Sequence, residues 1–259
     1  MKAVILAAGL CTRLRHSTQG LPKTLLRFGQ RTILDYQLDS LFETGFREVA
    51  IVVGYQKEHI LDHVARRRWE GQATVTFIEN PRYAETNNIY SLWLALPWVG
   101  ETSFLALNAD VLYHPDILRP ALAAREPIAV IIDPEFRLDP IKVLIQGSRV
   151  TAMRKGIPRH ESCGTYVGIT WFSAGICAAF FAAMNSLVEE GQLGVFFNVA
   201  VERLIAQGVP VGFTTTQGLP WTEVDDEEDV KFARSHVVPL LLAESEPAGR
   251  QPVRPLASG

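Results

Sequence analysis

Short apolar segments alternate with helix-like segments through the first 110 residues, and few folds accommodate such an alternation. The apolar segments are rich in branched side chains and read AVILAA (3–8), EVAIVVGY (48–55), ATVTFIEN (73–80) and SFLALNAD (103–110). Runs of this kind are typical of parallel strands that are buried on both faces. The pattern predicts an α/β protein with a doubly wound, mostly parallel sheet, whose ligands lie beyond the carboxyl ends of the strands.

The segments between these strands have the spacing of amphipathic helices. In residues 32–45 five apolar side chains share one face, and Thr32 and Gly45 are suited to the two ends of the helix. Helical spacing also runs through residues 57–69 and from Asn87 to Pro97, where we expect the proline to end the helix.

The pattern changes after Asp133. Residues 141–156 and 165–174 predict antiparallel strands, residues 175–190 and 195–207 predict helices, and a further strand follows at 209–216. We therefore expect a smaller antiparallel and helical lobe that returns to the main sheet. The expected organisation is one domain at 1–242 and a disordered tail at 243–259 that is rich in Pro, Ser, Gly and Ala. Within the domain we expect a ligand-binding part at about 1–133, the smaller lobe at about 134–215 and a returning segment at about 216–235.

Composition excludes several classes of protein. Hydrophobic residues make up 47% of the chain and the formal net charge is −3, so no general affinity for nucleic acid or for an anionic membrane is expected. No apolar stretch reaches the roughly 18 residues of a membrane span. Three cysteines fit no metal or disulfide framework and predict reduced thiols in a cytoplasmic protein. A homo-oligomer is compatible with the sequence.

A basic, glycine-bearing loop follows the first strand. It lacks the spacing of a Walker A loop, and Cys11 stands where a dinucleotide fingerprint would place its second glycine. Arg13 can grip phosphate oxygens with two donors, and Lys23 supplies a point charge. The loop therefore predicts a phosphate site; the alternative is a surface loop with two scattered cations.

Three carboxylates are candidate Mg²⁺ ligands. Asp110 ends a predicted strand on the ligand side of the sheet, and Glu223 and Asp225 are two residues apart, so in an extended chain they face the same way. The alternative is that these acids only favour a helix start. We assign that second role to Asp226, Glu227 and Glu228.

Together, these residues resemble the sugar-phosphate nucleotidyltransferase superfamily, whose fold is Rossmann-like. The segment LAAGLCTRLRHSTQGLPKTLL (6–26) is similar to its signature loop, and TNNIYSL (86–92), LNADV (107–111), MRKGI (153–157) and WTEVDDEEDV (221–230) resemble its cytidylyltransferase branch. That branch acts on phosphocholine, phosphonates and polyol phosphates. The resemblance covers roughly residues 1–235. Two positions depart from it: Cys11 replaces a usual glycine, and Thr165 replaces a carboxylate.

The resemblance implies a site that binds a nucleoside triphosphate, with CTP favoured, and a small phosphate or phosphonate acceptor. Arg13, Lys23, Lys142 and Lys155 would be catalytic. Nucleotide contacts would come from Leu6, Ala7, Ala8, Gly9, Leu10, Cys11, Thr12, Arg13, Lys23, Gly54, Asn87, Asn88 and Ser91. Acceptor contacts would come from Lys142, Lys155, Tyr166, Trp171 and Trp221.

Three other functions fit parts of the sequence. One is a hexose-1-phosphate nucleotidyltransferase that uses UTP, GTP or dTTP. Another is a glycosyltransferase of similar architecture, although Asn108 stands where its metal motif has a first acid. The third is a non-catalytic nucleotide-binding module on the same fold, which Cys11 favours and the cations and acids oppose.

Overall fold

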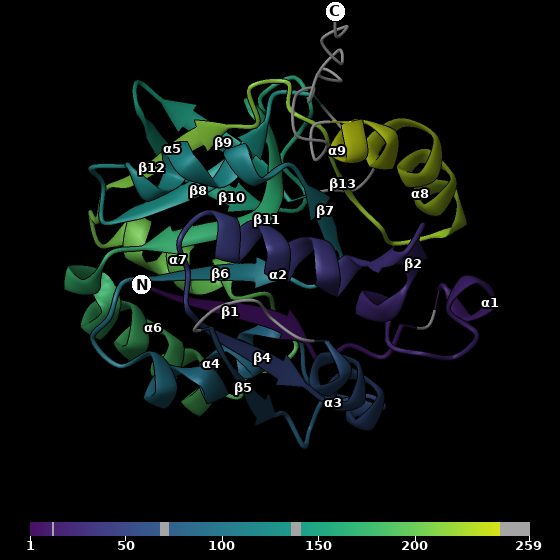
Figure 1. The fold of residues 1–259 in the computed structure, drawn as a ribbon. Helices are drawn as coiled ribbons and strands as arrows, with labels where there is room; N and C mark the ends of the chain where they lie inside the picture. The colour runs from purple at the N-terminus through teal and green to yellow at the C-terminus, as the bar shows by residue number, and fades with distance from the viewer. Residues whose placement is uncertain (12, 68–72, 136–140, 244–259) are drawn as a thin grey trace, which may run out of the picture.

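A large mixed sheet forms the centre of the molecule (Figure 1). The computed structural model describes residues 1–11, 13–67, 73–135 and 141–243. Four strands pair in parallel in the order β6-β1-β4-β5, with bounds Lys2–Ala7 (β1), Glu48–Val53 (β4), Thr74–Glu79 (β5) and Phe104–Asn108 (β6). The first-half alternation of the sequence is therefore confirmed as a parallel sheet.

The second half of the chain extends the same sheet. Strand β11 pairs antiparallel with β6, and β9 and β8 both pair with β11, while β12 runs parallel to β8. The bounds are Ile128–Asp133 (β8), Lys142–Gln146 (β9), Arg149–Arg154 (β10), Gly164–Phe172 (β11) and Val211–Thr215 (β12). The predicted antiparallel strands thus continue the main sheet as a mixed edge.

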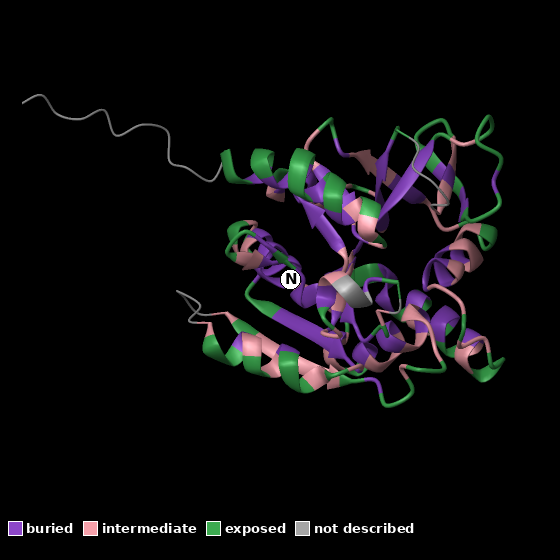
Figure 2. Cartoon of the chain, turned by 90° about the vertical axis from the view of Figure 1, so that its right-hand side faces the viewer, coloured by how far each residue is buried: buried purple, intermediate pink, exposed green. Residues whose placement is uncertain are grey.

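Helices cover both faces of this sheet. One face carries α2 (Ile33–Glu43), α3 (Lys57–Arg66) and α5 (Leu118–Leu122), and the other α4 (Asn88–Val99), α6 (Cys177–Glu189) and α7 (Asn198–Ala206). Successive side chains of β1 and β4 pack into opposite clusters, because alternate residues of a strand point to opposite faces. Figure 2 shows strands buried between helices whose outer faces are exposed. The doubly wound α/β fold is confirmed.

Local signals set the ends of the helices. Thr32 caps α2 and forms a reciprocal capping box with Asp35, and Gly45 follows the helix with a φ of 95°. Helix α4 does not end at Pro97, as the sequence predicted, but continues to Val99. A proline costs one backbone hydrogen bond, and in the last turn of a helix the neighbouring backbone accommodates that loss more easily than in the middle.

A third apolar cluster joins the C-terminal segment to the loop after β1. It contains Leu14, Val224 and Val230. The elements around it are α1 (Arg15–Thr18), the 3₁₀ turn η1 (Lys23–Leu25), strands β2 (Arg27–Phe28), β3 (Arg31–Thr32), β7 (Val111–Tyr113) and β13 (Trp221–Glu223), and helices α8 (Glu227–Phe232), η4 (Ala233–Val237) and α9 (Val238–Ala243).

Two further 3₁₀ turns precede helices α5 and α6: η2 (Pro115–Ile117) and η3 (Ala174–Ile176). Of the predicted tail, Ala243 ends α9 and residues 244–259 lie outside the described residues. Among the described helices none is both long and apolar enough to cross a membrane.

Candidate active site

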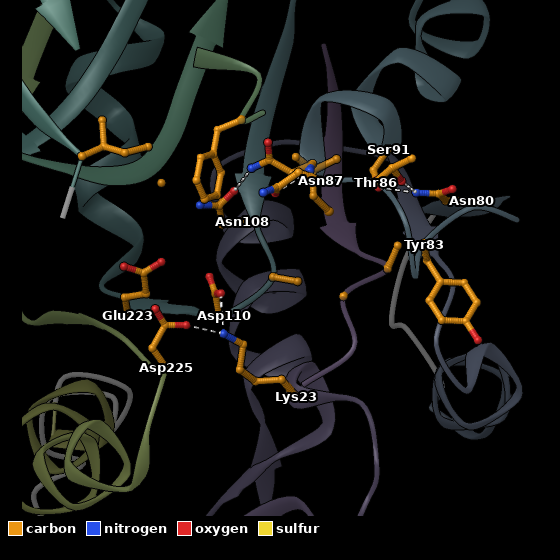
Figure 3. A pocket seen from close by; sticks show the side chains of 18 of the residues that line it. Lys23, Asn80, Tyr83, Thr86, Asn87, Ser91, Asn108, Asp110, Glu223 and Asp225 are labelled. Atoms are coloured by element: carbon orange, nitrogen blue, oxygen red, sulfur yellow. Dashed lines mark hydrogen bonds and ion pairs between the residues drawn. The ribbon is translucent and has the colours of Figure 1, made fainter. Parts of the chain in front are cut away.

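Two adjoining hollows open at the carboxyl edge of the parallel strands. Their volumes are about 320 and 290 Å³, and they share walls made by the loop after β1 and by the acids that the sequence singled out. The residues common to both are Leu6, Gly9, Arg13, Lys23, Ala109, Asp110 and Asp225. The sheet edge predicted to bind ligands is therefore where the structure has its cleft (Figure 3).

Lys23 links the loop to two of the acids. Its Nζ lies 2.6 Å from Asp110 Oδ2 and 2.7 Å from Asp225 Oδ1 (Figure 3). Burial lowers the pKa of Lys23, but the two carboxylates more than offset this, so its pKa is raised overall. Lys23 is therefore a charged ammonium, and since an ammonium has three donors, one N–H remains beyond these two bonds.

The local chain sets the direction of the acids. Val224 is fully buried in the third cluster, so Glu223 and Asp225 on either side of it face the cleft. The Val224 amide donates to the Asp110 carbonyl at 2.9 Å, and β13 pairs with β7, which directly follows Asp110. Two segments more than a hundred residues apart are thus held in register.

The three carboxylates could hold a divalent cation. One oxygen from each of Asp110, Glu223 and Asp225 lies within 4.8 Å of the others. Burial, together with the charges of the other two acids, raises the pKa of Glu223 to about 8. Asp110 Oδ1 is buried and has no hydrogen-bond partner among the described residues. Crowded carboxylates and an unpaired oxygen fit Mg²⁺, which binds a few hard oxygen ligands.

Arg13 and Cys11 define the shape of the loop. Arg13 Nη2 lies 3.0 Å from Asp225 Oδ2, and the Arg13 side chain is 66% exposed, so it is accessible to a ligand. Cys11 has a φ of 52°, the left-handed region that favours glycine, which gives a physical reason for the glycine usual in similar loops. Its sulfur lies 3.9 Å from Thr18 Oγ1. Thr12, a predicted nucleotide contact, lies outside the described residues.

Gly54 lets the backbone pack closely at the far wall of the cleft. A Cβ at this position would lie 2.6 Å from Tyr83 Cβ and 2.9 Å from the Ala8 carbonyl oxygen. Tyr83 and Ala8 both line the larger hollow. Gly54 therefore sets the distance between the loop and the tyrosine that closes this end.

We predict that Gly54→Ala weakens nucleotide binding by about tenfold, because Tyr83 must move at its Cβ rather than at the flexible end of its side chain. Calorimetric titration with a nucleoside triphosphate would measure the loss. Gly175→Ala is the matched control, since a Cβ at Gly175 meets nothing within 4 Å and Gly175 lines neither hollow. Equal affinities for the Gly54→Ala variant and the parent would contradict this account of the wall.

Amide side chains near the start of α4 are held by structural hydrogen bonds. Asn87 caps the helix by accepting from the Asn88 amide, as the sequence predicted, and Asn88 Nδ2 donates to Asn108 Oδ1 at 3.2 Å. The Phe197 amide donates to Asn88 Oδ1 at 2.9 Å. Ser91 accepts from the buried Asn80. Asn87, Asn88 and Ser91 all line the cleft, and these bonds fix their positions there.

The wall of the cleft at which the sequence predicts acceptor contacts is formed by the mixed edge of the sheet. Lys155 lines the wall after β10, and its Nζ lies 5.8 Å from the centre of the Phe196 ring. Tyr166 also lines the wall, but its hydroxyl bonds to Thr170 Oγ1 at 2.7 Å within the same strand. Burial raises the pKa of Tyr166, so this hydroxyl stays neutral.

Comparison with known proteins identifies the family. A family model described as the MobA-like NTP transferase domain matches residues 3–164, which is more than half of the chain. The chain belongs to this family. The matched residues include the loop, Lys23 and Asp110, and they end at Gly164, the first residue of β11.

Individual relatives support the same family. The chain is 43% identical over 94 residues to choline-phosphate cytidylyltransferase of Streptococcus pneumoniae, a match that covers 36% of this chain and 38% of the relative. It is 27% identical over 242 residues to the bifunctional IPC transferase and DIPP synthase of Rubrobacter xylanophilus, covering 91% of this chain and 52% of the relative. The chain thus spans about half or less of the length of these two relatives.

A solved structure has the same fold. The inositol-1-phosphate CTP transferase from T. maritima superposes with a TM-score of 0.77 at 23% sequence identity, covering 96% of this chain and 97% of that chain. At this identity the likeness concerns the fold alone.

Three residues expected in the acceptor site of this MobA-like protein do not line the described cleft. Lys142, the first residue of β9, lines neither hollow, whereas its neighbour Ile141 lines the larger one. Trp171 lies near the far end of β11, which runs antiparallel to β6 and so leads away from the carboxyl edge. The Trp221 indole is buried and donates to the carboxylate of Asp133. Their expected acceptor contacts stay predictions.

Other lining residues were not predicted. Asn80 and Asn108 stand at the carboxyl ends of β5 and β6, a position that could have marked them as candidates. Thr86, Tyr83, Ile141, Gly168 and Phe196 also line the cleft. Phe196 approaches from a loop more than a hundred residues away from Asn88, and no local sequence signal marks such an approach.

Proposed function

We propose that the protein is a nucleotidyltransferase that transfers a nucleotidyl group, with CTP preferred, to a small phosphorylated or phosphonate metabolite and releases pyrophosphate. The observation that carries the proposal is the meeting of Lys23 from the loop with Asp110 and Asp225 at the cleft. The family match and the cytidylyltransferases among the relatives support it.

On the nucleotide side, residues 8–11 with Arg13 would hold the β- and γ-phosphates. The exposed guanidinium of Arg13 would exchange part of its contact with Asp225 for hydrogen bonds to phosphate oxygens. Lys23 is oriented by two carboxylates, and its third N–H would contact the α-phosphate, where negative charge grows during the reaction. The base would lie against Ala8 and Tyr83, whose close approach Gly54 permits.

An oxygen of the acceptor phosphate or phosphonate would attack the α-phosphorus in line with the departing pyrophosphate. One P–O bond forms there as the bond between the α-phosphorus and the bridging oxygen breaks, and that oxygen leaves with the pyrophosphate. A phosphate monoester is largely a dianion near pH 7, because its second pKa is about 6, so no strong general base is required. Lys155 would offset the charge of the acceptor at the cleft wall. Catalysis of this kind depends on position and charge.

Mg²⁺ would be held by Asp110, Glu223 and Asp225, where it would neutralise charge on the phosphate oxygens. Lys23 bonds Asp110 through Oδ2 and leaves Oδ1 unpaired among the described residues, so a lysine and a cation could share this carboxylate. Burial raises the pKa of Asp225, but Lys23 and Arg13 lower it more, and the carboxylate stays charged at neutral pH.

We predict that CTP exceeds UTP, GTP, dTTP and ATP in kcat/KM by at least about tenfold, equivalent to roughly 1.4 kcal/mol in the transition state. The test is a pyrophosphate-release screen that crosses these nucleotides with phosphocholine, aminoethylphosphonate, polyol phosphates and sugar 1-phosphates. A preference for UTP, GTP or dTTP with a sugar 1-phosphate would replace the cytidylyltransferase by the hexose-1-phosphate alternative. Nucleotide binding without pyrophosphate release from any pair would favour the non-catalytic module.

A further inference from the structure

The loop after β1, here called the nucleotide loop, touches residues 223–230, here called the metal-binding segment, at several points. Two polar contacts reach Asp225, one from Arg13 and one from Lys23. Leu14 adds apolar packing, since it shares a buried cluster with Val224 and Val230. These contacts bring the loop and residues 223–230 together before any substrate is bound.

A further polar contact joins Ser17 in α1 to Glu227, the first residue of α8. The Ser17 amide donates to Glu227 Oε1 at 3.3 Å, and the Ser17 hydroxyl donates to Glu227 Oε2. Both carboxylate oxygens are therefore used. The Ser17 amide belongs to the first turn of a helix, where amides lack partners within the helix, so Glu227 satisfies a donor that α1 itself leaves open.

These contacts differ in what happens to them when a nucleotide binds. In the proposed reaction Arg13 and Lys23 both contact phosphates, so part of their attachment to Asp225 is exchanged for the ligand. Neither Ser17 nor Glu227 lines either hollow, so a nucleotide in the cleft does not compete for their bond. The Ser17–Glu227 contact can persist while the cations change partners.

We propose that Glu227 is a positioning residue, which holds the nucleotide loop on the metal-binding segment while Arg13 and Lys23 engage phosphates. The inference rests on the proposed function and extends it to a residue that the sequence assigned only to a helix start. Glu227 stabilises the loop in the position from which Lys23 reaches both Asp110 and the α-phosphate. The loop of a variant without this carboxylate has more conformational freedom to lose when a nucleotide binds.

The experiment compares Glu227→Ala, Glu227→Gln, Ser17→Ala and the Ser17→Ala/Glu227→Ala double variant with the parent. Glu228→Gln is the matched control, because Glu228 is exposed and lies one residue further along the same helical turn. Calorimetry with Mg²⁺ and the nucleoside triphosphate that the parent binds most tightly gives Kd. Pyrophosphate release gives kcat and KM, and melting temperature records stability.

Glu227→Ala should raise Kd by about tenfold and lower kcat, as expected for loss of a bidentate bond to a half-buried carboxylate. Glu227→Gln retains one acceptor oxygen and should be intermediate. The double variant should be no worse than Glu227→Ala, because both changes remove one contact. Glu228→Gln should match the parent.

The inference is overturned if Glu227→Ala binds the nucleotide and turns it over like the parent, whatever its melting temperature. It is also overturned if the losses from Ser17→Ala and Glu227→Ala add in full. Absence of pyrophosphate release from the parent would remove the proposed function, and the Kd series would still decide whether Glu227 positions the loop. A parent that binds no nucleoside triphosphate would overturn both.

Discussion

Asp110→Asn is expected to lower Mg²⁺-dependent kcat by about a thousandfold, or roughly 4 kcal/mol, while the protein stays folded. Asp110 has one oxygen bonded to Lys23 and a second, buried oxygen with no hydrogen-bond partner in the described part of the chain. The amide of asparagine fits the same space, but it removes a charge and turns one acceptor into a donor. The change therefore damages both the cation site and the orientation of Lys23. Steady-state kinetics at limiting and saturating Mg²⁺ would measure it.

Glu223→Gln and Asp225→Asn should act in the same direction as Asp110→Asn, because one oxygen of each residue falls within the same 4.8 Å group. Glu228→Gln is the control, since Glu228 is exposed and belongs to the first turn of α8. The metal-free melting temperature should stay close to that of the parent, because removing one of three crowded acids also relieves repulsion. If Glu228→Gln is inactive while Glu223→Gln and Asp225→Asn are both active, the cation site lies at the start of α8 and this assignment of its ligands is wrong.

The core of the fold and the centre of the site could be predicted from the sequence because both depend on short-range patterns. An apolar run such as residues 3–8 is best accommodated as a central strand of a three-layered α/β protein, between the helices on the two faces of a sheet. The carboxyl edge of such a sheet is where ligands bind, and this placed Asp110. Alternation around Val224 placed Glu223 and Asp225 on one side of the chain.

Whether a residue lines the two hollows depends, for several of the predicted site residues, on strand register and on long-range pairing. Lys142 and Ile141 differ by one position, and a strand offers no local signal for which of two neighbours faces a cleft. Trp171 was expected to contact the acceptor. Because β11 runs antiparallel to β6, Trp171 lies toward the opposite edge of the sheet. Strands β7 and β13 have three residues each, too few to show a period, and yet their pairing brings Asp110 to the other two acids.

Lys23→Ala is expected to lower kcat by about 10²–10³-fold, with a smaller change in the Kd of the nucleoside triphosphate. Lys23 Nζ already bonds two carboxylates in the free protein, and the one donor left beyond these bonds meets the phosphate oxygen whose charge grows most in the transition state. Loss of such a contact affects the transition state more than the bound ground state. Pyrophosphate-release kinetics and calorimetric titration with CTP would separate the two effects.

The matched control for Lys23→Ala is Lys57→Ala, which removes a lysine that pairs with Glu79 on the surface, outside both hollows. This control should retain the kcat and Kd of the parent. Without nucleotide, the Lys23→Ala variant should also bind Mn²⁺ more tightly than the parent. In this variant Asp110 and Asp225 lose the ammonium that offsets their negative charge. If the Lys23→Ala variant keeps the parent kcat and has a raised KM, Lys23 acts in binding of the ground state. If its Mn²⁺ affinity is unchanged, the ammonium does not compete with a cation for these carboxylates.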